Sequence, residues 1–539
     1  MSLHHLPLGQ AALRAPGAAP MRSWPLHTAA ATRMLEQAAQ AALPPHTLMQ
    51  RAALALARWL RALYPHGRHI WVAAGPGNNG GDGLLAAALW QQWAHSERLL
   101  DRTVTVTWTG SEAHLPPDAA YALAMARQAG VRIQPDVPAH FDVAVDALLG
   151  LGSRPEPPRE LAACLDRLRR SPQPVLHVDL PSGLAPDTGT WFGQIHTPDS
   201  SPSPTVGPRH TLALLTLKPG LFTGLGRDLA GDLWWDDLDV ASSPDHPPTA
   251  WLQTGGTETE ATARRPHTSH KGSHGDVLVL GGQGLAQDGS AMVGAALLAA
   301  RAALHAGAGR VFVGLLDGGQ QMLDPQQPEL MFRTPEHWID DAASTFGAAG
   351  VSVVCGCGGG TAVEQVLPDV LRHCTALVLD ADALNAVARR GDLQELLRRR
   401  SETAGVSTIL TPHPLEAARL LGCTTEQVQQ DRLATAQRLA ERYQAVVVLK
   451  GSGTVICAPG TLPCVNATGN ARLATGGTGD VLAGLLGARL AAPPATGPAA
   501  LVAAQAVAEH GLLADRWPEG ETLTASRLSR AASSPPAAR

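Results

Sequence analysis

Asp480 lies where a glycine-rich loop is expected to turn into a helix. Gly476, Gly477 and Gly479 precede it in the stretch NATGNARLATGGTGDVLAGLLGARL. Glycine lets the backbone lie flat against a ligand and adopt positive φ, and the helix that follows points its free amides toward the loop. Such an end suits a phosphate or an oxyanion, while the Asp480 carboxylate can accept a proton from a hydroxyl. The alternative is a glycine hinge followed by an acidic residue that complements the helix dipole.

Three polar clusters in the first half follow apolar segments that are expected to be strands. They are Asn78–Asp82 in GPGNNGGDG, Asp146 in VDALLG and Asp179–Ser182 in VDLPSG. The first cluster satisfies G-x-G-x-x-G, which alone would indicate a dinucleotide-binding Rossmann loop. Adjacent asparagines and an aspartate are foreign to that pattern, and their oxygens better suit a hard cation or a polar substrate. Loop capping is the alternative for Asp146 and for Asp179.

Three basic side chains also follow expected strands. Lys450 ends a strand in VVVLKGSGTVIC, and the alternative is a surface hairpin that ends in lysine. His413 lies between two prolines, which fix its loop, although a lone histidine is more often structural than catalytic. Lys218 in LLTLKPG is either a site ammonium or a surface lysine, and we do not include it among the site residues.

Strands and helices alternate in both halves. The first half carries HIWVAA, TVTVTW, FDVAVDALLG, PVLHVDLPSG and LALLTL, and the second carries DVLVLGG, RVFVG, VSVVCG, ALVLDAD, STILTPH and VVVLKGS. Segments with helical spacing separate them, as in TLMQRAALALARWLRAL. This alternation predicts α/β folds with mostly parallel, doubly wound sheets, in which ligands bind at the carboxyl ends of the strands.

The length of 539 residues predicts two domains. Residues 1–24 are expected to be a disordered lead. Residues 241–264 are rich in proline, serine, threonine and glycine without helical or strand period, so they are expected to be a linker. The domains then span residues 25–240 and 265–539. The halves share neither motifs nor motif order, which indicates a fusion and not an internal repeat.

Composition excludes several classes of function. The net charge of −5 provides no basic footprint for nucleic acid or an anionic membrane. No apolar run reaches the roughly 20 residues of a membrane span, and the N-terminus lacks a secretory signal. The seven cysteines are scattered, and Cys355-Gly-Cys357 has the wrong spacing for a zinc knuckle. We therefore expect a cytoplasmic protein that acts on small molecules, and we also expect a homo-oligomer.

The second half resembles the ribokinase-like family of NAD(P)H-hydrate dehydratases over about residues 265–515. The resemblance is carried by HKGSHGDVLVLGG, LVLDADALNAV, TILTPHPLEAARLLG, the Lys450 segment and the Asp480 loop. It implies an ADP- or ATP-dependent enzyme that uses Mg²⁺ and removes the C6 hydroxyl of hydrated NADH or NADPH. The resemblance assigns Asp480 as the catalytic base. Matching positions would bind substrate at Ala295, Gly358, His413 and Asp480, and nucleotide at Lys450, Gly451, Ser452, Gly453, Thr454 and Gly479.

One loop departs from that family. In VCGCGGG, Cys357 replaces the family's proline and Gly359 replaces its leucine. We expect this loop to be more flexible than in the family, which bears on substrate affinity at Gly358.

The first half, over about residues 25–240, resembles the NAD(P)H-hydrate epimerase family, which implies a Rossmann-like three-layer fold. GPGNNGGDG, VDALLG and VDLPSG carry this resemblance. It implies interconversion of the R and S forms of the hydrated cofactor, with Asp179 as the catalytic acid/base and K⁺ held by Asn79, Asp146 and Ser182. The implied substrate residues are Asn78, Asn79, Gly80, Gly81, Asp82, Gly150, Leu151, Gly152, Ser153, Arg154, Pro155, Glu156 and Asp179.

Together the resemblances imply repair of NADHX and NADPHX, the hydrated cofactors. The first domain would supply the S epimer, and the second would dehydrate it with ADP to NADH or NADPH, AMP and phosphate. The alternatives are a ribokinase-like vitamin or sugar kinase fused to a nucleotide-binding domain, and a protein that binds nucleotides without catalysis. The sequence leaves open whether ADP or ATP is the donor.

Overall fold

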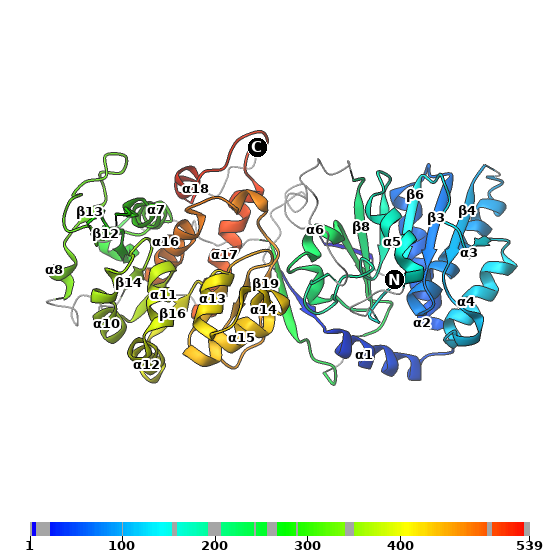
Figure 1. The fold of residues 1–539 in the computed structure, drawn as a ribbon, viewed down its shortest axis with the longest axis horizontal. Coiled ribbons are helices and arrows are strands. Elements are labelled where there is room, and N and C mark those ends of the chain that lie inside the picture. The colour runs from blue at the N-terminus through cyan, green and yellow to red at the C-terminus, as the bar shows by residue number, and fades with distance from the viewer. Residues whose placement is uncertain are drawn as a thin grey trace. The chain divides into compact units, whose positions relative to one another are not determined.

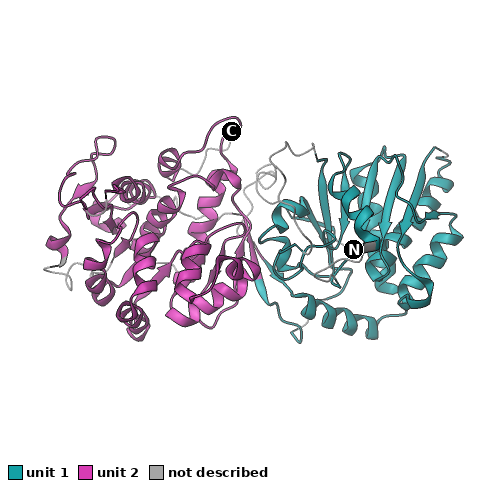
Figure 2. Ribbon diagram, in the orientation of Figure 1, with its two compact units in different colours: residues 1–8, 24–250 teal, residues 9–23, 251–539 magenta. Residues whose placement is uncertain are grey.

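The computed structural model describes residues 3–6, 22–99, 101–152, 159–191, 206–241, 244–255, 267–286, 289–339, 350–492 and 498–532. It divides into two compact units (Figures 1 and 2). Unit 1 consists of residues 1–8 and 24–250, and unit 2 of residues 9–23 and 251–539. Both are α/β units built on largely parallel sheets, which confirms the predicted fold class.

Unit 1 contains a sheet in the order β1-β9-β8-β7-β6-β3-β4-β5, with only β1 antiparallel to its neighbour among these described strands. The strands of this sheet are β1 (Leu3–Leu6), β3 (His69–Ala74), β4 (Thr103–Trp108), β5 (Arg132–Gln134), β6 (Val143–Ala147), β7 (Val175–Val178), β8 (Arg209–Leu214) and β9 (Asp232–Asp236). A further strand, β2 (Arg22–Leu26), lies between β1 and β3 in the sequence. The helices are α1 (Ala29–Ala42), α2 (Thr47–Leu63), α3 (Asn78–Ser96), α4 (Pro117–Gln128), α5 (Ala162–Arg169) and α6 (Gly226–Ala230).

The strand order reverses at β3. After β3 the chain adds β4 and β5 on one side, and it then returns to place β6 on the other. In doubly wound sheets, ligands bind at such a reversal, at the carboxyl ends of the strands. Asn78–Asp82 form the first turn of α3, directly after β3, and Gly150–Gly152 lie in the loop after β6, so the topology brings two predicted substrate segments to one edge.

Unit 2 also contains a largely parallel sheet with a reversal of strand order, but its sequence differs from that of unit 1. Its strands run in the order β13-β12-β11-β14-β15-β16-β17-β18-β19-β10. They are β10 (Ala250–Thr254), β11 (Asp276–Gly281), β12 (Arg310–Leu315), β13 (Met331–Phe332), β14 (Val351–Cys355), β15 (Ala376–Leu379), β16 (Ser407–Leu410), β17 (Val446–Leu449), β18 (Val455–Cys457) and β19 (Cys464–Asn466). The helices are α7 (Val293–His305), α8 (Pro335–Ile339), α10 (Val363–His373), α11 (Ala381–Arg389), α12 (Gly391–Arg399), α13 (Pro414–Leu421), α14 (Thr425–Gln430), α15 (Arg432–Tyr443), α16 (Thr478–Ala491), α17 (Ala499–Asp515) and α18 (Ala525–Ala531).

Helix α16 packs closely against α7 and the sheet. A Cβ at Gly484 would lie 2.0 Å from the Ala299 carbonyl oxygen, and one at Gly487 would lie 2.5 Å from Val354 Cγ2. Both positions therefore exclude larger residues. This packing fixes the start of α16, and with it Asp480, over the carboxyl ends of the central strands.

Two expected boundaries differ from the structure. Leu3–Leu6 of the expected disordered lead form β1 against β9, where the His5 and Trp234 rings contact each other with centroids 4.7 Å apart and Leu6 is buried. Ala250–Thr254 of the expected linker form β10, parallel to β19. There Gln253 is buried and donates a hydrogen bond to the Ala504 carbonyl at 3.0 Å. Both β1 and β10 are too short to show a period of alternating apolar residues in the sequence.

No helix among the described residues is both long and apolar enough to cross a membrane. All seven cysteines are free thiols.

Candidate active sites

Unit 1 encloses a cavity of about 550 Å³ at the predicted edge of its sheet. This volume is in the range of small-molecule sites. Residues from the loops after β3, β6, β7 and β8 and from α1 line it. The lining residues include Glu36, Asn78, Asn79, Asp82, Asp118, Gly150, Leu151, Gly152, Asp179 and Lys218. The predicted substrate residues Ser153, Arg154, Pro155 and Glu156 lie outside the described residues.

The start of α3 forms one wall of this cavity. A Cβ at Gly80 would lie 2.0 Å from the Gly75 carbonyl oxygen, so this position must be glycine for the loop to close. Asn78 Oδ1 and Asn79 Nδ2 are buried without a hydrogen-bond partner among the described residues. Because a buried polar group is normally paired, both amides are suited to contact a polar ligand. Gly81 packs behind them, close to Met49.

Asp179 forms an ion pair with Lys218. The Lys218 ammonium contacts Asp179 Oδ1 and donates to the Leu214 carbonyl at 2.7 Å, and both side chains are almost fully buried. Asp179 Oδ1 also accepts from the Leu214 amide at 3.0 Å, and Asp179 adopts φ 66°. Such backbone strain in a residue other than glycine is concentrated at functional sites. Lys218 was not included among the predicted site residues, whereas the structure places it beside the predicted acid/base, Asp179.

Two further carboxyl groups line the cavity near Asp179. Burial, followed by the charge of Asp179, raises the pKa of Glu36. The same two effects and Glu36 raise the pKa of Asp82 well above its ordinary value. The cavity therefore combines Asp179, paired with lysine, and two carboxyl groups whose pKa values are raised. Glu36 was not predicted because it lies on an ordinary amphipathic helix.

Asp146, in β6, and Ser182, in the loop after β7, lie beside each other. Ser182 Oγ donates to Asp146 Oδ1 at 2.5 Å, the Ser182 amide donates to Oδ2 at 2.9 Å, and His177 Nδ1 lies 2.8 Å from Oδ2. Burial alone would raise the pKa of Asp146, but the bonds from His177 and Ser182 outweigh it and lower the pKa. The Leu149 carbonyl lies 3.3 Å from Ser182 Oγ. Carboxylate, hydroxyl and carbonyl oxygens thus converge here, with Asn79 against Gly150 on the adjoining loop.

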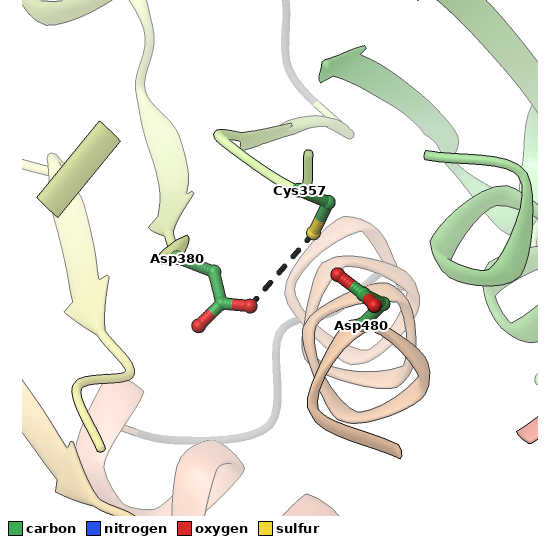
Figure 3. A group of neighbouring side chains, drawn as sticks. All are labelled: Cys357, Asp380 and Asp480. Carbon is green, nitrogen blue, oxygen red and sulfur yellow. Dashed lines mark hydrogen bonds between the residues drawn. The ribbon is translucent and has the colours of Figure 1, made fainter. Parts of the chain in front are cut away.

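In unit 2, Asp480 lies in the first turn of α16 (Figure 3). Gly477 caps this helix with φ 90°, and a Cβ there would lie 2.6 Å from Leu298 Cδ1. The glycine is thus required by the backbone and by packing. A Cβ at Gly479 would lie 3.3 Å from the Lys450 ammonium, which places that cation beside the helix start. Burial, followed by the charge of Asp380, raises the pKa of Asp480 to about 6.

Asp380 organises the floor of this site. Its Oδ1 accepts from the Lys450 ammonium at 2.7 Å and from the Thr411 hydroxyl at 2.7 Å, while its Oδ2 faces Cys357 Sγ at 3.9 Å. Burial opposes the charge of Lys450, but the carboxylates of Asp380 and Glu416 outweigh it and raise the pKa of Lys450. Lys450 therefore remains an ammonium. Asp380 belongs to a motif noted in the sequence but was not among the predicted site residues.

The turn at Lys450–Thr454 is held from behind by Arg432. This buried guanidinium donates to the carbonyls of Leu449, Lys450 and Gly453 at 3.2, 3.2 and 3.4 Å. A Cβ at Gly451 would lie 2.9 Å from Arg432 Nη1. The turn predicted to bind nucleotide, which also contains Ser452, is therefore fixed by a residue of α15 that sequence analysis did not identify.

His413 is the N-cap of α13. Its Nδ1 accepts from the amides of Leu415 and Glu416 at 3.2 and 3.4 Å, and the Glu416 carboxylate accepts from the His413 amide at 2.8 Å. This capping box assigns Nδ1 as an acceptor, so the neutral ring carries its proton on Nε2. Burial raises the pKa of Glu416 to about 7. The histidine predicted to contact substrate thus also has a structural role.

The remaining predicted residues, Ala295 and Gly358, lie against each other. A Cβ at Gly358, which has φ 59°, would lie 2.9 Å from Ala295 Cβ. The Gly358 carbonyl accepts from the Gln283 amide at 2.6 Å. The loop from Cys355 to Gly358 is therefore tied to the loop after β11, at the reversal of strand order in this sheet.

Known proteins match both units. The family described as NAD(P)H-hydrate dehydratase matches residues 277–534, and the YjeF-related protein N-terminus matches residues 45–220. The bifunctional NAD(P)H-hydrate repair enzyme of Escherichia coli strain K12 is 36% identical over 460 residues, covering 83% of this chain and 80% of that one. The Coxiella burnetii enzyme of the same name is 34% identical over 495 residues, covering 90% and 93%. An ADP/ATP-dependent NAD(P)H-hydrate dehydratase from Bacillus subtilis, co-crystallised with ATP and Mg²⁺, is 31% identical and covers 50% of this chain and 91% of its own, with a TM-score of 0.41.

The two family matches and the two bifunctional relatives define a two-domain α/β enzyme with an N-terminal epimerase domain and a C-terminal dehydratase domain. The chain belongs to the family of bifunctional NAD(P)H-hydrate repair enzymes.

Proposed function

We propose that this chain repairs hydrated nicotinamide cofactors in two steps. Unit 1 interconverts the R and S forms of NADHX and NADPHX, and unit 2 dehydrates the S form with ADP to give NADH or NADPH, AMP and phosphate. The observation that carries this proposal is the presence of two different acid/base centres on one chain. One is the Asp179–Lys218 pair in the cavity of unit 1, and the other is Asp480 beside Lys450 in unit 2.

In unit 1, Asp179 is the acid/base that acts at C6 of the substrate. The Lys218 ammonium pairs with this buried carboxylate and holds its orientation, because a buried carboxylate needs a paired cation. The two asparagines Asn78 and Asn79 hold the nicotinamide nucleotide with Gly80, Gly81 and Asp82. The loop from Gly150 to Glu156 completes the substrate site.

Asn79, Asp146 and Ser182 hold K⁺ in this proposal. The convergence of the Asp146 carboxylate, the Ser182 hydroxyl and the Leu149 carbonyl supports it, because hard cations prefer oxygen ligands. The ion would fix the loops after β6 and β7, which both contribute to the cavity.

Removal of potassium is therefore expected to slow epimerisation and to leave dehydration unchanged. The measurement is the initial rate of R-to-S conversion in buffers with K⁺ or with tetramethylammonium at equal ionic strength. Dehydration of pure S epimer by the same preparation is the control. Equal epimerisation rates in the two buffers would refute the potassium site.

In unit 2, the substrate hydroxyl lies at Asp480, which accepts its proton as a phosphoryl group passes from ADP to the C6 oxygen and AMP leaves. The C6–O bond then breaks, the ring nitrogen lone pair expels phosphate, and NADH or NADPH forms. Lys450 and the amides at the start of α16 stabilise charge on the transferring group. Mg²⁺ bound with the nucleotide would neutralise its phosphates, and the Asp380 and Asp480 carboxylates would offer the oxygen ligands that this ion prefers. The turn from Lys450 through Gly451, Ser452 and Gly453 to Thr454 binds the nucleotide with Gly479. His413, Ala295 and Gly358 line the substrate pocket.

The pKa of about 6 at Asp480 predicts the pH profile of dehydration. Because a general base acts in its ionised form, kcat/KM should rise with pH through about 6 and fall about tenfold per unit below it. Epimerisation, which uses Asp179, should not share this inflection. Glu416→Gln removes the neighbouring carboxyl group, whose pKa of about 7 would otherwise overlap the inflection from Asp480. Glutamine can still cap α13, so the variant keeps the helix start intact. A profile of this variant without the inflection near 6 would contradict the assignment.

Product analysis tests the proposed function against a vitamin or sugar kinase. The protein is incubated with ADP and S-NADHX, and separately with ATP and small alcohols that such kinases phosphorylate. We expect NADH, AMP and phosphate from the first mixture in equal amounts and no stable phosphorylated product from the second. Accumulation of a phosphorylated alcohol would favour the kinase.

A further inference from the structure

Three metal-ligating atoms meet in unit 2. Cys357 Sγ and one carboxylate oxygen each of Asp380 and Asp480 lie within 4.8 Å of one another (Figure 3). They come from three separate elements, namely the loop after β14, the end of β15 and the first turn of α16. Cys357 is fully buried and Asp380 is 2% exposed. Packing of these elements, and not a flexible surface, therefore fixes the spacing of the atoms.

The two oxygens of Asp380 are divided between different partners. Oδ1 accepts from Lys450 and Thr411, whereas Oδ2 faces the thiol of Cys357. Cys357 Sγ and Asp380 Oδ2 lie 3.9 Å apart, a weak hydrogen bond from the thiol. A tetrahedral zinc ion would hold a sulfur and an oxygen ligand about 3.6 Å apart, given its usual bond lengths. The observed spacing is therefore close to the one that a bridging ion would require.

The chemistry of the three ligands selects the ion. Thiolate is a soft ligand that favours Zn²⁺ or Cd²⁺, while Mg²⁺ prefers oxygen ligands alone. Three protein ligands leave a fourth tetrahedral position for water or substrate. The charges also balance, because one thiolate and two carboxylates oppose a divalent cation and the Lys450 ammonium.

We propose that Cys357, Asp380 and Asp480 form a binding site for a thiophilic divalent cation, Zn²⁺ or Cd²⁺, and that its occupation inhibits the dehydratase centre. On binding, the Cys357 S–H bond breaks, its proton passes to solvent, and a metal–sulfur bond forms without a change of oxidation state. The bound ion occupies the Asp480 oxygen that accepts the substrate proton. The inhibition rests on the proposed function, whereas the binding does not.

Binding is tested on the full chain after treatment with a chelator. Cd²⁺ is titrated while the near-ultraviolet band of Cd²⁺–thiolate bonds and the bound ion are measured. Cys357→Ser keeps a hydrogen-bond donor and removes the soft ligand. Cys355→Ala is the matched control, because Cys355 is a buried cysteine two residues away that lies outside the cluster. We expect the wild type and Cys355→Ala to bind one more Cd²⁺ per chain than Cys357→Ser, with the corresponding band.

Inhibition is tested by adding Zn²⁺ to both assays. Zn²⁺ should inhibit ADP-dependent dehydration in the wild type and in Cys355→Ala. The Cys357→Ser variant should need a Zn²⁺ concentration at least about tenfold higher for the same inhibition. Epimerisation should be unaffected. Thermal unfolding verifies that each variant is folded, and Cys357→Ala replaces Cys357→Ser if the serine variant is not.

Equal Cd²⁺ stoichiometry, affinity and thiolate band in the wild type and the Cys357 variant would overturn the metal site. Cd²⁺ binding that depends on Cys357 without loss of dehydration would overturn the inhibition. If no preparation dehydrates S-NADHX, the proposed function fails, while the Cd²⁺ titration still decides the site.

Discussion

Asp480→Asn is expected to lower the rate of ADP-dependent dehydration by about 10²–10⁴-fold, the range typical for removal of a general base. Asparagine preserves the shape of the side chain in the first turn of α16 but cannot accept the proton of the substrate hydroxyl. The structure supports this large effect because Asp480 is partly buried beside Lys450, where its pKa is raised to about 6. The measurement is the rate of NADH formation from pure S-NADHX with saturating ADP.

Epimerisation by the same Asp480 variant should remain at the wild-type rate, because Asp480 does not belong to the cavity of unit 1. Asp369→Asn is the matched control, since this carboxylate pairs with Arg372 at the surface of α10. It should leave both activities unchanged. A near-normal dehydration rate in Asp480→Asn would exclude the general-base role.

Asp179→Asn is expected to abolish epimerisation to a similar extent, about 10²–10⁴-fold. The substitution removes the acid/base and leaves the buried Lys218 ammonium without its carboxylate. Breaking a buried ion pair in this way costs about 3–5 kcal/mol of stability. Loss of activity must therefore be separated from loss of folding. The assay is conversion of pure R-NADHX without ADP, together with the unfolding free energy.

The double variant Asp179→Asn, Lys218→Met makes that separation. It removes both charges, so it should recover stability relative to Asp179→Asn while epimerisation stays lost. Asp166→Asn serves as the control, because Asp166 is exposed and its carboxylate pairs with Arg170 at the end of α5. Recovery of epimerisation in the double variant would show that Asp179 acts only through the fold.

The sequence was most informative where secondary structure alternates. The apolar strands and amphipathic helices predicted two doubly wound sheets, and polar residues at successive strand ends meet at the cavity of unit 1 because parallel strands share an edge. Asn78, Asp82 and Asp179 were identified in this way. The roles of these residues remain proposals that the variants above test.

Other site residues could not be predicted, because their positions depend on tertiary packing. Lys218 follows a strand as many surface lysines do, and only the fold shows that it is buried against Asp179. Arg432 begins an ordinary helix, yet its guanidinium holds the turn after β17. Short strands gave no periodic signal, so β1 and β10 were mistaken for lead and linker. Burial, which no local pattern records, separates these residues from similar ones at the surface.

The central claim, that one chain clears both epimers of the hydrated cofactor, is tested most directly by complete turnover of an epimer mixture. Pure protein is incubated with mixed R- and S-NADHX in potassium buffer, with and without ADP, and NADH and both epimers are followed by chromatography. With ADP, we predict that both epimers disappear and that NADH accounts for all of them. Without ADP, the epimers should equilibrate and no NADH should form. If, with ADP, the protein consumes only the S form and R-NADHX decays no faster than without protein, the account is contradicted.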